Sequence, residues 1–401
     1  MNKLTVKDVE LKGKKVIVRV DFNVPLDEKL NITDDRRIQE SLPTIKFLLQ
    51  ANAQKVILMS HLGRPSGKVV EALRLTPVAK RLEELLGEKI LKLDDCVGAV
   101  IKERIEKFSP RVILLENLRF HKEEEENNPE FAKQLAALAD VYVSDAFGTV
   151  HRAHASTTGI TKYLPAVAGF LLEKEMKYLA GAINNPQRPL IVLLGGAKVS
   201  DKITLIENLL NKADIIIIGG GMVYTFLKAL GKNIGNSKLD AGKIDTAKKI
   251  LEKAKQKNVL IELSSDFVAV SDFNKPETKK IVKGDIPDGW EGLYIGPQTR
   301  KRFKELLAKG KTIIWNGPVG VFEMDAYAEG TRDIAQFLAN LKNVTTIVGG
   351  GDSAAAVAKF NLEKGFTHIS TGGGASLELL EGKELPGIAA LMDKEKNTVS
   401  R

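Results

Sequence analysis

Two lysines, Lys198 and Lys202, follow a glycine turn near the middle of the chain. Before the turn, the five apolar residues 190–194 form a pattern typical of a strand buried on both faces. We expect Gly195-Gly196 to lead into a helix that carries both lysines on one face, since they are four residues apart. Backbone N–H groups and the helix dipole favour an anion there. The stretch therefore predicts a phosphate site, although by itself it equally fits a buried strand followed by two solvated lysines.

Arginine, histidine and acid or amide side chains follow several predicted strands in the first half of the chain. These residues are Asp21, Asn23, His61, Arg64, Arg119, His151, Arg152 and His154, with Arg37 a short way beyond the first strand. One arginine in a loop is usually only solvated, but the repeated choice favours a binding site. The planar guanidinium group suits bidentate contacts with phosphate and carboxylate. The acidic run Glu123–Glu126 is expected to be a solvated helix start.

Glycine is concentrated in the second half, where 26 of the 34 glycines lie after residue 170. Clusters follow predicted strands at 219–221, 349–351 and 372–374, where backbone N–H groups can approach a phosphate closely. Asp352 within one cluster suits a Mg²⁺ ion beside phosphates. The turn Gly349–Ala354 also fits the dinucleotide pattern G-x-G-x-x-A, but the acidic residue expected about 20 positions later is absent. An NAD-dependent dehydrogenase using this turn remains an alternative.

The elements that position these residues alternate between strand and helix in both halves. Strands are predicted at 16–20, 56–60, 112–115, 141–148, 190–194, 215–218, 259–263, 312–315, 345–348 and 368–370. This alternation indicates two doubly wound parallel sheets, which bind ligands beyond the carboxyl ends of their strands. A chain of 401 residues is long enough for two domains. The helical pattern at 170–185 links them.

The composition excludes several function classes. No apolar run approaches the roughly 18 residues of a membrane span, and the N-terminus lacks a signal-peptide core. The net charge of +9 is spread over both halves, with 27 basic and 24 acidic residues before position 171 and 33 and 27 after it. We therefore expect no nucleic-acid partner. The single cysteine, Cys96, excludes an intramolecular disulfide and indicates a cytoplasmic protein.

Familiar catalytic signatures are missing from the chain. A Walker A loop ending at Gly310-Lys311 fails because Glu305 occupies the position of its first glycine, and neither a G-x-S-x-G elbow nor His/Cys metal spacing occurs. A lobe for a small, multiply charged anion and a lobe for a nucleotide with Mg²⁺ remain. The residues alone therefore predict phosphoryl transfer.

Eight segments in order resemble the phosphoglycerate kinase family. They are RVDFNVP (19–25), SHLGRP (60–65), ENLRF (116–120), DAFGTVHRAHAS (145–156), GGAKVSDK (195–202), WNGPVGVFE (315–323), GGGDS (349–353) and TGGGASLELLEGKELPG (371–387). The resemblance implies two Rossmann-like lobes joined by an interdomain helix and a hinge. It also implies reversible transfer of a phosphoryl group between ATP and the carboxylate of 3-phosphoglycerate, giving 1,3-bisphosphoglycerate and ADP, in glycolysis and gluconeogenesis. A carboxylate is already ionised at pH 7, so no general base is needed.

The resemblance also implies residue roles. The triose is expected at Asp21, Asn23, Arg37, His61, Arg64, Arg119 and Arg152. The nucleotide is expected at Gly195, Lys198, Lys202, Gly292, Asn316, Pro318, Glu323, Gly350, Gly351, Asp352 and Ser353, with Glu323 at the ribose and Asp352 as the Mg²⁺ ligand. The transferring group is expected to meet Arg37, Lys198, Lys202, Gly351, Gly373 and Gly374.

The implied domain organisation places 3-phosphoglycerate on residues 1–169 and the nucleotide on residues 186–387. Residues 170–185 form the interdomain helix, and a tail at 388–401 packs back on the first domain. The enzyme is expected to be a monomer that closes about this helix and its flanking loops, because direct transfer requires the two ligands to meet.

Overall fold

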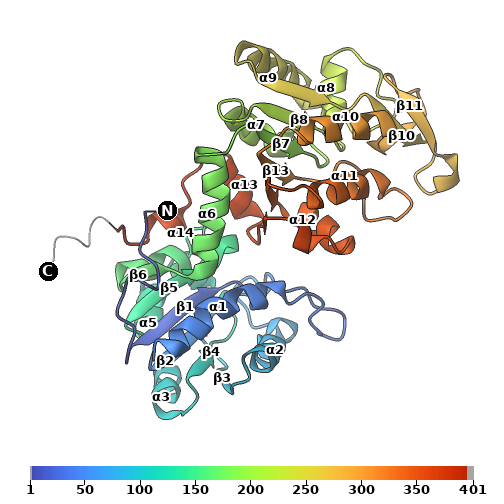
Figure 1. Cartoon of the computed structure of the whole chain (residues 1–401). Coiled ribbons are helices and arrows are strands. Elements are labelled where there is room, and N and C mark those ends of the chain that lie inside the picture. Colours follow the sequence, from blue (N-terminus) through green and yellow to red (C-terminus); the bar gives the residue numbers. More distant parts are fainter. Residues whose placement is uncertain (1, 395–401) are drawn as a thin grey trace. The chain divides into compact units, whose positions relative to one another are not determined.

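The computed structural model describes residues 2–394 and divides the chain into two compact units (Figure 1). Unit 1 contains the residues up to Lys177 together with those from Glu384 onward, and unit 2 spans Tyr178–Lys383. The division lies inside helix α6, Phe170–Asn184, the helix predicted to link the halves. Of the predicted C-terminal tail, residues 395–401 lie outside the described residues.

Within the described residues, unit 1 is built on a six-stranded parallel sheet in the order β3-β4-β2-β1-β5-β6. The strands are β1 Lys15–Val20, β2 Lys55–Met59, β3 Ile90–Lys92, β4 Val112–Leu114, β5 Val141–Asp145 and β6 Ala166–Ala168. The helices are α1 Arg36–Gln50, α2 Thr76–Leu86, α3 Ala99–Lys107, α4 Lys122–Glu125, α5 Pro129–Ala136, the first part of α6 and α14 Pro386–Ala389. Central strands such as β2 are buried at every residue, as parallel strands covered on both faces must be.

Residues after Glu384 join unit 1 through backbone hydrogen bonds. Leu4 N donates to Met392 O at 2.8 Å, and Gly387 N donates to Val150 O at 2.8 Å. The Lys3 ammonium group also donates to Leu391 O at 2.8 Å. Both ends of the described chain are therefore held on the same unit.

In the described part of the chain, unit 2 contains a six-stranded sheet in the order β15-β14-β13-β7-β8-β9, parallel throughout. Its strands are β7 Leu190–Leu194, β8 Ile215–Ile218, β9 Leu260–Leu263, β13 Thr312–Asn316, β14 Thr345–Gly349 and β15 His368–Ile369. The helices are α7 Ile203–Leu209, α8 Val223–Ala229, α9 Ile244–Gln256, α10 Pro297–Leu307, α11 Glu329–Ala339, α12 Gly351–Lys359 and α13 Gly374–Leu380. The predicted pair of doubly wound parallel sheets is confirmed.

A second, antiparallel sheet in unit 2 was not predicted. It consists of β11 Lys280–Lys283, β10 Asp266–Val270 and β12 Glu291–Ile295, in that order. Only two residues separate the end of β9 from the start of β10, so the segment reads in sequence as one strand followed by a loop. The pairing of β10 with β11 and β12 is what makes the segment a strand, and that pairing is decided by tertiary contacts. This small sheet supplies one wall of the cavity described below.

Candidate active site

In unit 1, the predicted triose residues follow neighbouring strands at one edge of the sheet. The register pairs Arg19 of β1 with Met59 of β2 and with Ser144 of β5, so the loops that leave these three strands begin side by side. The loops carry Asp21 and Asn23 after β1, His61 and Arg64 after β2, and Arg152 after β5. Because all these strands are parallel, this is the edge where ligands bind in doubly wound folds.

A hydrogen-bonded network joins several of these side chains. Arg37 Nη1 donates to Asp21 Oδ2 at 2.7 Å. Asn23 Oδ1 accepts from Gly63 N at 2.8 Å, and Arg119 Nη1 donates to Gly63 O at 2.9 Å. The network places the side chains from the β1, β2 and β4 loops in a fixed arrangement around Gly63.

The exposure of the arginines differs. Arg119 is buried, and burial lowers the pKa of its guanidinium group below the usual range, with Glu125 opposing the shift. Arg37 and Arg152 are partly buried, whereas Arg64 is exposed. A buried arginine must have its donors satisfied and is therefore fixed, while the exposed one is free to reorient toward a ligand.

His61 is buried among positive charges. Burial lowers the pKa of the ring to well below its usual value, and Arg19, Arg119, Arg37 and Arg152 lower it further. Four guanidinium groups near one neutral ring form an environment that favours a multiply charged anion.

Two buried residues beside this cluster were missed by sequence reasoning. Arg19 lies in strand β1 and is 1% exposed, although the strand pattern around it is apolar. Glu124 is 0% exposed, so the prediction that Glu123–Glu126 is a solvated helix start is wrong at this position. For Arg19, the signal in the sequence was a single charged residue within an apolar strand. Such a residue indicates that a buried partner exists but does not identify it.

In unit 2, the glycine turn after β7 differs from the expected helix start. Lys198 is exposed in a loop, and Lys202 ends a short 3₁₀ helix, η6 Ser200–Lys202, before α7 begins. The prediction that both lysines share one face of an α-helix is therefore wrong. Asp240 Oδ2 accepts from Ser200 N at 3.0 Å, a contact from outside the segment that helps to fix this non-helical start.

Gly195 is required for a close backbone approach. Its N–H donates to Asn316 O, and Gly196 N–H donates to Pro318 O, each at 3.0 Å. A Cβ atom at Gly195 would lie 2.0 Å from Pro318 O, a distance that no side chain tolerates. Packing against the turn after β13 thus explains this glycine, whereas the sequence pattern predicts phosphate binding by its N–H.

Lys202 lies against that same turn. Its ammonium group donates to Asn316 O at 2.6 Å and also to the Asn316 side-chain oxygen. Burial lowers the pKa of Lys202 to about 7, while Asp352 and Asp201 act in the opposite direction. The predicted residues Lys202, Asn316 and Pro318 are therefore neighbours.

The N-terminus of helix α12 lies beside Lys202, Asn316 and Pro318. Gly350 is its N-cap with φ of 90°, and Gly351 and Asp352 begin the helix with exposed side-chain positions. Ser353 Oγ accepts from Gly317 N at 2.6 Å, which ties α12 to the turn after β13. Gly373 and Gly374 similarly begin α13, and Gly373 has φ of 48°.

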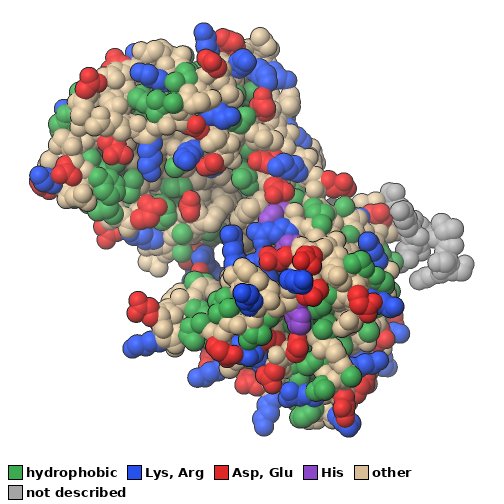
Figure 2. All heavy atoms as spheres, turned by 180° about the vertical axis from the view of Figure 1, so that it is seen from behind, with side chains coloured by type: hydrophobic (Ala, Val, Ile, Leu, Met, Phe, Trp, Pro, Cys, Tyr) green, Lys and Arg blue, Asp and Glu red, His purple; other side chains and the backbone are tan. Residues whose placement is uncertain are grey.

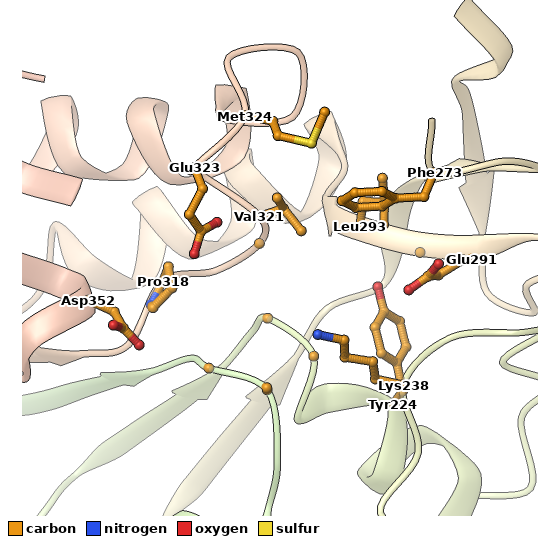
Figure 3. A pocket seen from close by; sticks show the side chains of 16 residues that line it. Tyr224, Lys238, Phe273, Glu291, Leu293, Pro318, Val321, Glu323, Met324 and Asp352 are labelled. Atoms are coloured by element: carbon orange, nitrogen blue, oxygen red, sulfur yellow. The ribbon is translucent and has the colours of Figure 1, made fainter. Parts of the chain in front are cut away.

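A cavity of about 370 Å³ opens beside these turns (Figure 3). Four predicted nucleotide residues line it, namely Gly292, Pro318, Glu323 and Asp352. Gly220 and Gly221, from the predicted glycine cluster at 219–221, also line the cavity. The sequence did not predict a further set of lining residues from distant segments, which includes Tyr224, Lys238, Phe273, Glu291, Leu293, Val321 and Met324. The size suits a nucleotide-sized ligand.

The two ends of the cavity differ in chemistry. Asp352, Pro318 and Glu323 lie on one side, and Tyr224, Phe273 and Leu293 lie on the other (Figure 3). A Cβ atom at Gly292 would lie 2.2 Å from the Tyr224 hydroxyl oxygen, so glycine is needed for this wall to close. One end therefore offers polar groups and a helix N-terminus, and the other combines apolar and aromatic surface with the charged side chains of Lys238 and Glu291 (Figure 3).

The structure also brings together Asp95, Cys96 and His121, whose potential ligand atoms lie within 4.8 Å of one another. This juxtaposition was hidden in sequence because His121 is far from the other two. Hydrogen bonds account for it, since His121 Nε2 lies 2.6 Å from Asp95 Oδ1 and Cys96 Sγ donates to Glu116 O at 3.0 Å. Burial keeps the pKa of the Cys96 thiol well above its usual value, which disfavours the thiolate that a metal requires.

The comparisons with known proteins all identify the same family. The phosphoglycerate kinase family model matches residues 6–383. The phosphoglycerate kinases of Gloeothece citriformis and Dictyoglomus turgidum are 58% and 56% identical over 387 and 398 residues. The first alignment covers 95% of this chain and 96% of the relative. The second covers 98% of each chain.

Solved structures agree with the sequence relatives. Phosphoglycerate kinase from Coxiella burnetii has a TM-score of 0.87 at 42% identity. The enzyme from Pyrococcus horikoshii has a TM-score of 0.80 at 32% identity. Each comparison covers 97% of this chain and 98% of the other.

Proposed function

The chain belongs to the phosphoglycerate kinase family, and from this premise we propose how its two units divide the reaction. The protein is a kinase that transfers a phosphoryl group between ATP and 3-phosphoglycerate. The alternative of an NAD-dependent dehydrogenase is not supported, since the family model and the relatives described above are all phosphoglycerate kinases. The predicted fold class and activity are thus confirmed, and the residue roles are proposals.

The triose site in our proposal is the strand edge of unit 1. Arg37, Arg64, Arg119 and Arg152 neutralise the phosphate and carboxylate of 3-phosphoglycerate, and His61 and Asn23 add polar contacts. Asp21 orients Arg37 through its 2.7 Å hydrogen bond. This assignment is supported by the several arginine side chains that lie around the buried, neutral ring of His61.

The nucleotide site in our proposal is the cavity of unit 2. Its apolar end, with Tyr224, Phe273 and Leu293, receives the base, and Glu323 accepts hydrogen bonds from the ribose hydroxyl groups. The phosphates then lie toward Pro318 and the N-terminus of α12, with Gly350–Ser353 and Lys202 close to them. The cavity is the single observation that carries the proposal, because it joins an apolar end to a phosphate-binding end within one unit.

The residues at this end of the cavity fit a Mg²⁺ ion. Asp352 has an exposed carboxylate that lines the cavity, and carboxylate oxygen is a ligand that Mg²⁺ prefers. In our proposal, Asp352 would hold the ion, which would supply positive charge to offset the negative charge of the phosphates.

Transfer itself is positioning and charge neutralisation. The acceptor carboxylate needs no proton removed, so the residues proposed to act are donors: Lys198 and Arg37, with backbone N–H groups at Gly351, Gly373 and Gly374. Lys202 remains hydrogen-bonded at Asn316 and supports the phosphate end of the cavity. Each of these hydrogen-bond donors stabilises the negative charge on the phosphoryl group while the group passes between the oxygen that it leaves and the oxygen that it joins.

We further propose a cytoplasmic monomer without a nucleic-acid partner. Cys96 is buried and free, which fits a reducing compartment. Among the described residues, no helix has the length and apolar character needed to cross a bilayer. On the face shown in Figure 2, basic and acidic side chains are interspersed, which does not resemble a continuous nucleic-acid surface.

A coupled assay with 3-phosphoglycerate and MgATP tests the activity, and two variants test the cavity. Glu323→Gln should raise the KM for ATP and leave the KM for 3-phosphoglycerate unchanged. Glu329→Gln is the matched control, because that exposed carboxylate pairs with Arg300 on α10, outside the cavity. Equal effects of the two variants on the KM for ATP would contradict the placement of the ribose at Glu323.

A further inference from the structure

We propose that Arg19 is a positioning residue that holds His61 as a neutral ring with its proton on Nε2, so that this N–H donates to an anionic oxygen of phosphoglycerate. The inference rests on the proposed function for the location of the triose. It concerns a residue that does not reach the ligand itself and acts through His61.

The hydrogen bond between the two side chains decides the tautomer. Arg19 Nη2 lies 3.1 Å from His61 Nδ1. A guanidinium group has only donors and stays charged at every relevant pH. His61 Nδ1 must therefore accept, and in a neutral imidazole the proton then sits on Nε2.

Arg19 is itself fixed by a buried network. Its Nε donates to Ser156 Oγ at 2.8 Å, and its Nη1 donates to Val20 O. The Ser156 hydroxyl in turn donates to Glu124 Oε1 at 2.6 Å, and Ser156 N donates to Glu124 Oε2 at 2.9 Å. Since Arg19 and Glu124 are 1% and 0% exposed, neither side chain can swing into solvent, and Arg19 keeps one orientation toward His61.

The second ring nitrogen of His61, Nε2, is available to bind a ligand. The ring is 4% exposed, and among the residues that the structure describes, Nε2 has no hydrogen-bond partner. The charged side chains that act most strongly on the ring are Arg19, Arg37, Arg119 and Arg152, and all four are positive. They oppose a second proton on the ring, so the Nε2 donor persists as pH falls instead of becoming an imidazolium.

Nuclear magnetic resonance on the free protein tests the tautomer without any ligand. The protein is labelled with ¹⁵N-histidine, and the His61 signals are assigned with His61→Gln. We expect a pyridine-type Nδ1 and a pyrrole-type Nε2 that persist from pH 8 to pH 5. A proton on Nδ1, or a doubly protonated ring anywhere between pH 8 and pH 5, would overturn the inference.

Two variants then test the positioning. Arg19→Gln replaces an obligate donor with an amide that can also accept, so both His61 tautomers should appear. The Kd for 3-phosphoglycerate should rise about tenfold, as expected for loss of a hydrogen bond to a charged group, while ADP binding to unit 2 stays unchanged. Ser156→Ala keeps every charge and the backbone contact to Glu124 but removes the hydroxyl that joins Arg19 to Glu124, and it should raise the KM for 3-phosphoglycerate with little change in kcat.

The matched control is Thr158→Ala, because Thr158 lies on the same short π-helical segment, Ala155–Gly159, and its hydroxyl only donates to His154 O at 3.1 Å. Unchanged tautomers in both Arg19→Gln and Ser156→Ala would overturn the role of Arg19. His61→Ala separately tests the proposed triose site. If His61→Ala leaves 3-phosphoglycerate binding unchanged, the placement of the triose fails, whereas the tautomer measurement still decides the claim about Arg19.

Discussion

The contacts of Lys198 do not by themselves indicate the catalytic role that we propose for it. It is exposed in the loop after β7, and no hydrogen bond of its side chain to another described residue holds it. An unrestrained ammonium group in a glycine-rich loop can move toward a phosphoryl group as negative charge develops there.

Lys198→Ala should therefore lower kcat by about 10²-fold, with both substrates still binding. Steady-state kinetics and calorimetry with ADP measure these two effects. Lys248→Ala is the control, because Lys248 is an exposed lysine on α9 outside the cavity. A Lys198→Ala enzyme with the kcat of the control would make Lys198 an ordinary surface lysine.

Arg64 is the exposed one of the arginines that we propose to bind the triose in unit 1. Its replacement should therefore disturb the fold least. Arg64→Ala should raise the KM for 3-phosphoglycerate about tenfold, because one charge-assisted contact is lost. ADP binding should stay within about 1 kcal/mol of the parent, since distant sites act independently. Calorimetry with ADP showing a collapse in affinity would refute the division of ligands between the units.

At the scale of elements, the start of α6 depends on a buried carboxyl group. Asp145, at the end of β5, accepts from Leu171 N at 2.9 Å and from Leu172 N at 3.4 Å. Burial raises the pKa of Asp145 to about 7, while Thr44 and the two backbone N–H groups oppose the shift. The side chain thus caps a helix whose residues belong to both units.

Asp145→Ala leaves two backbone N–H groups without an acceptor and should lower the free energy of unfolding by about 2 kcal/mol. Asp145→Asn keeps an acceptor and should lose less. Chemical denaturation of both variants, followed by circular dichroism, measures the difference. Equal losses would mean that the cap contributes nothing specific.

The pH dependence of the Asp145→Asn variant follows from the raised pKa. The folded state of the parent binds one more proton than the unfolded state between about pH 4 and pH 7. The parent's stabilisation from this proton is therefore complete below about pH 4 and is lost as pH rises toward 7. Asp145→Asn lacks this titration, so its stability relative to the parent should rise over that window, and parallel curves would contradict the assignment.

At the scale of the molecule, the two proposed sites belong to different units, so the reaction depends on bringing the two bound ligands together. Direct transfer needs the reacting oxygen and phosphorus atoms within about 3.5 Å of one another, in a site that excludes water. We therefore expect binding of both ligands to favour a more closed arrangement of the two units than either ligand alone.

X-ray scattering measures this closure. The radius of gyration should fall with 3-phosphoglycerate and a non-hydrolysable MgATP analogue together, and should change less with either ligand. The singly bound samples are the internal control. An unchanged radius with calorimetry proving that both sites are filled would show that closure does not accompany binding.

Most strands of the two parallel sheets, and the chemistry of the loops that follow them, could be predicted from the sequence. Continuous apolar runs such as 190–194 predict buried parallel strands because only a sheet covered on both faces buries every residue. The repeated arginines and histidines after strands in the first half, and the glycine turns in the second, predict anion sites because these strand ends share one edge. The family resemblance assigned roles to those positions.

Tertiary structure alone decided what distant residues do to one another. Nothing local reveals that Arg19 faces His61, that Glu124 is buried, or that the turn after β13 occupies the space beside Gly195. The cavity likewise combines Tyr224, Phe273 and Leu293 from separate segments, and one wall comes from an antiparallel sheet that exists only through pairing. Side-chain burial and hydrogen-bond partners depend on what packs against a segment, and that information lies outside any window of neighbouring residues.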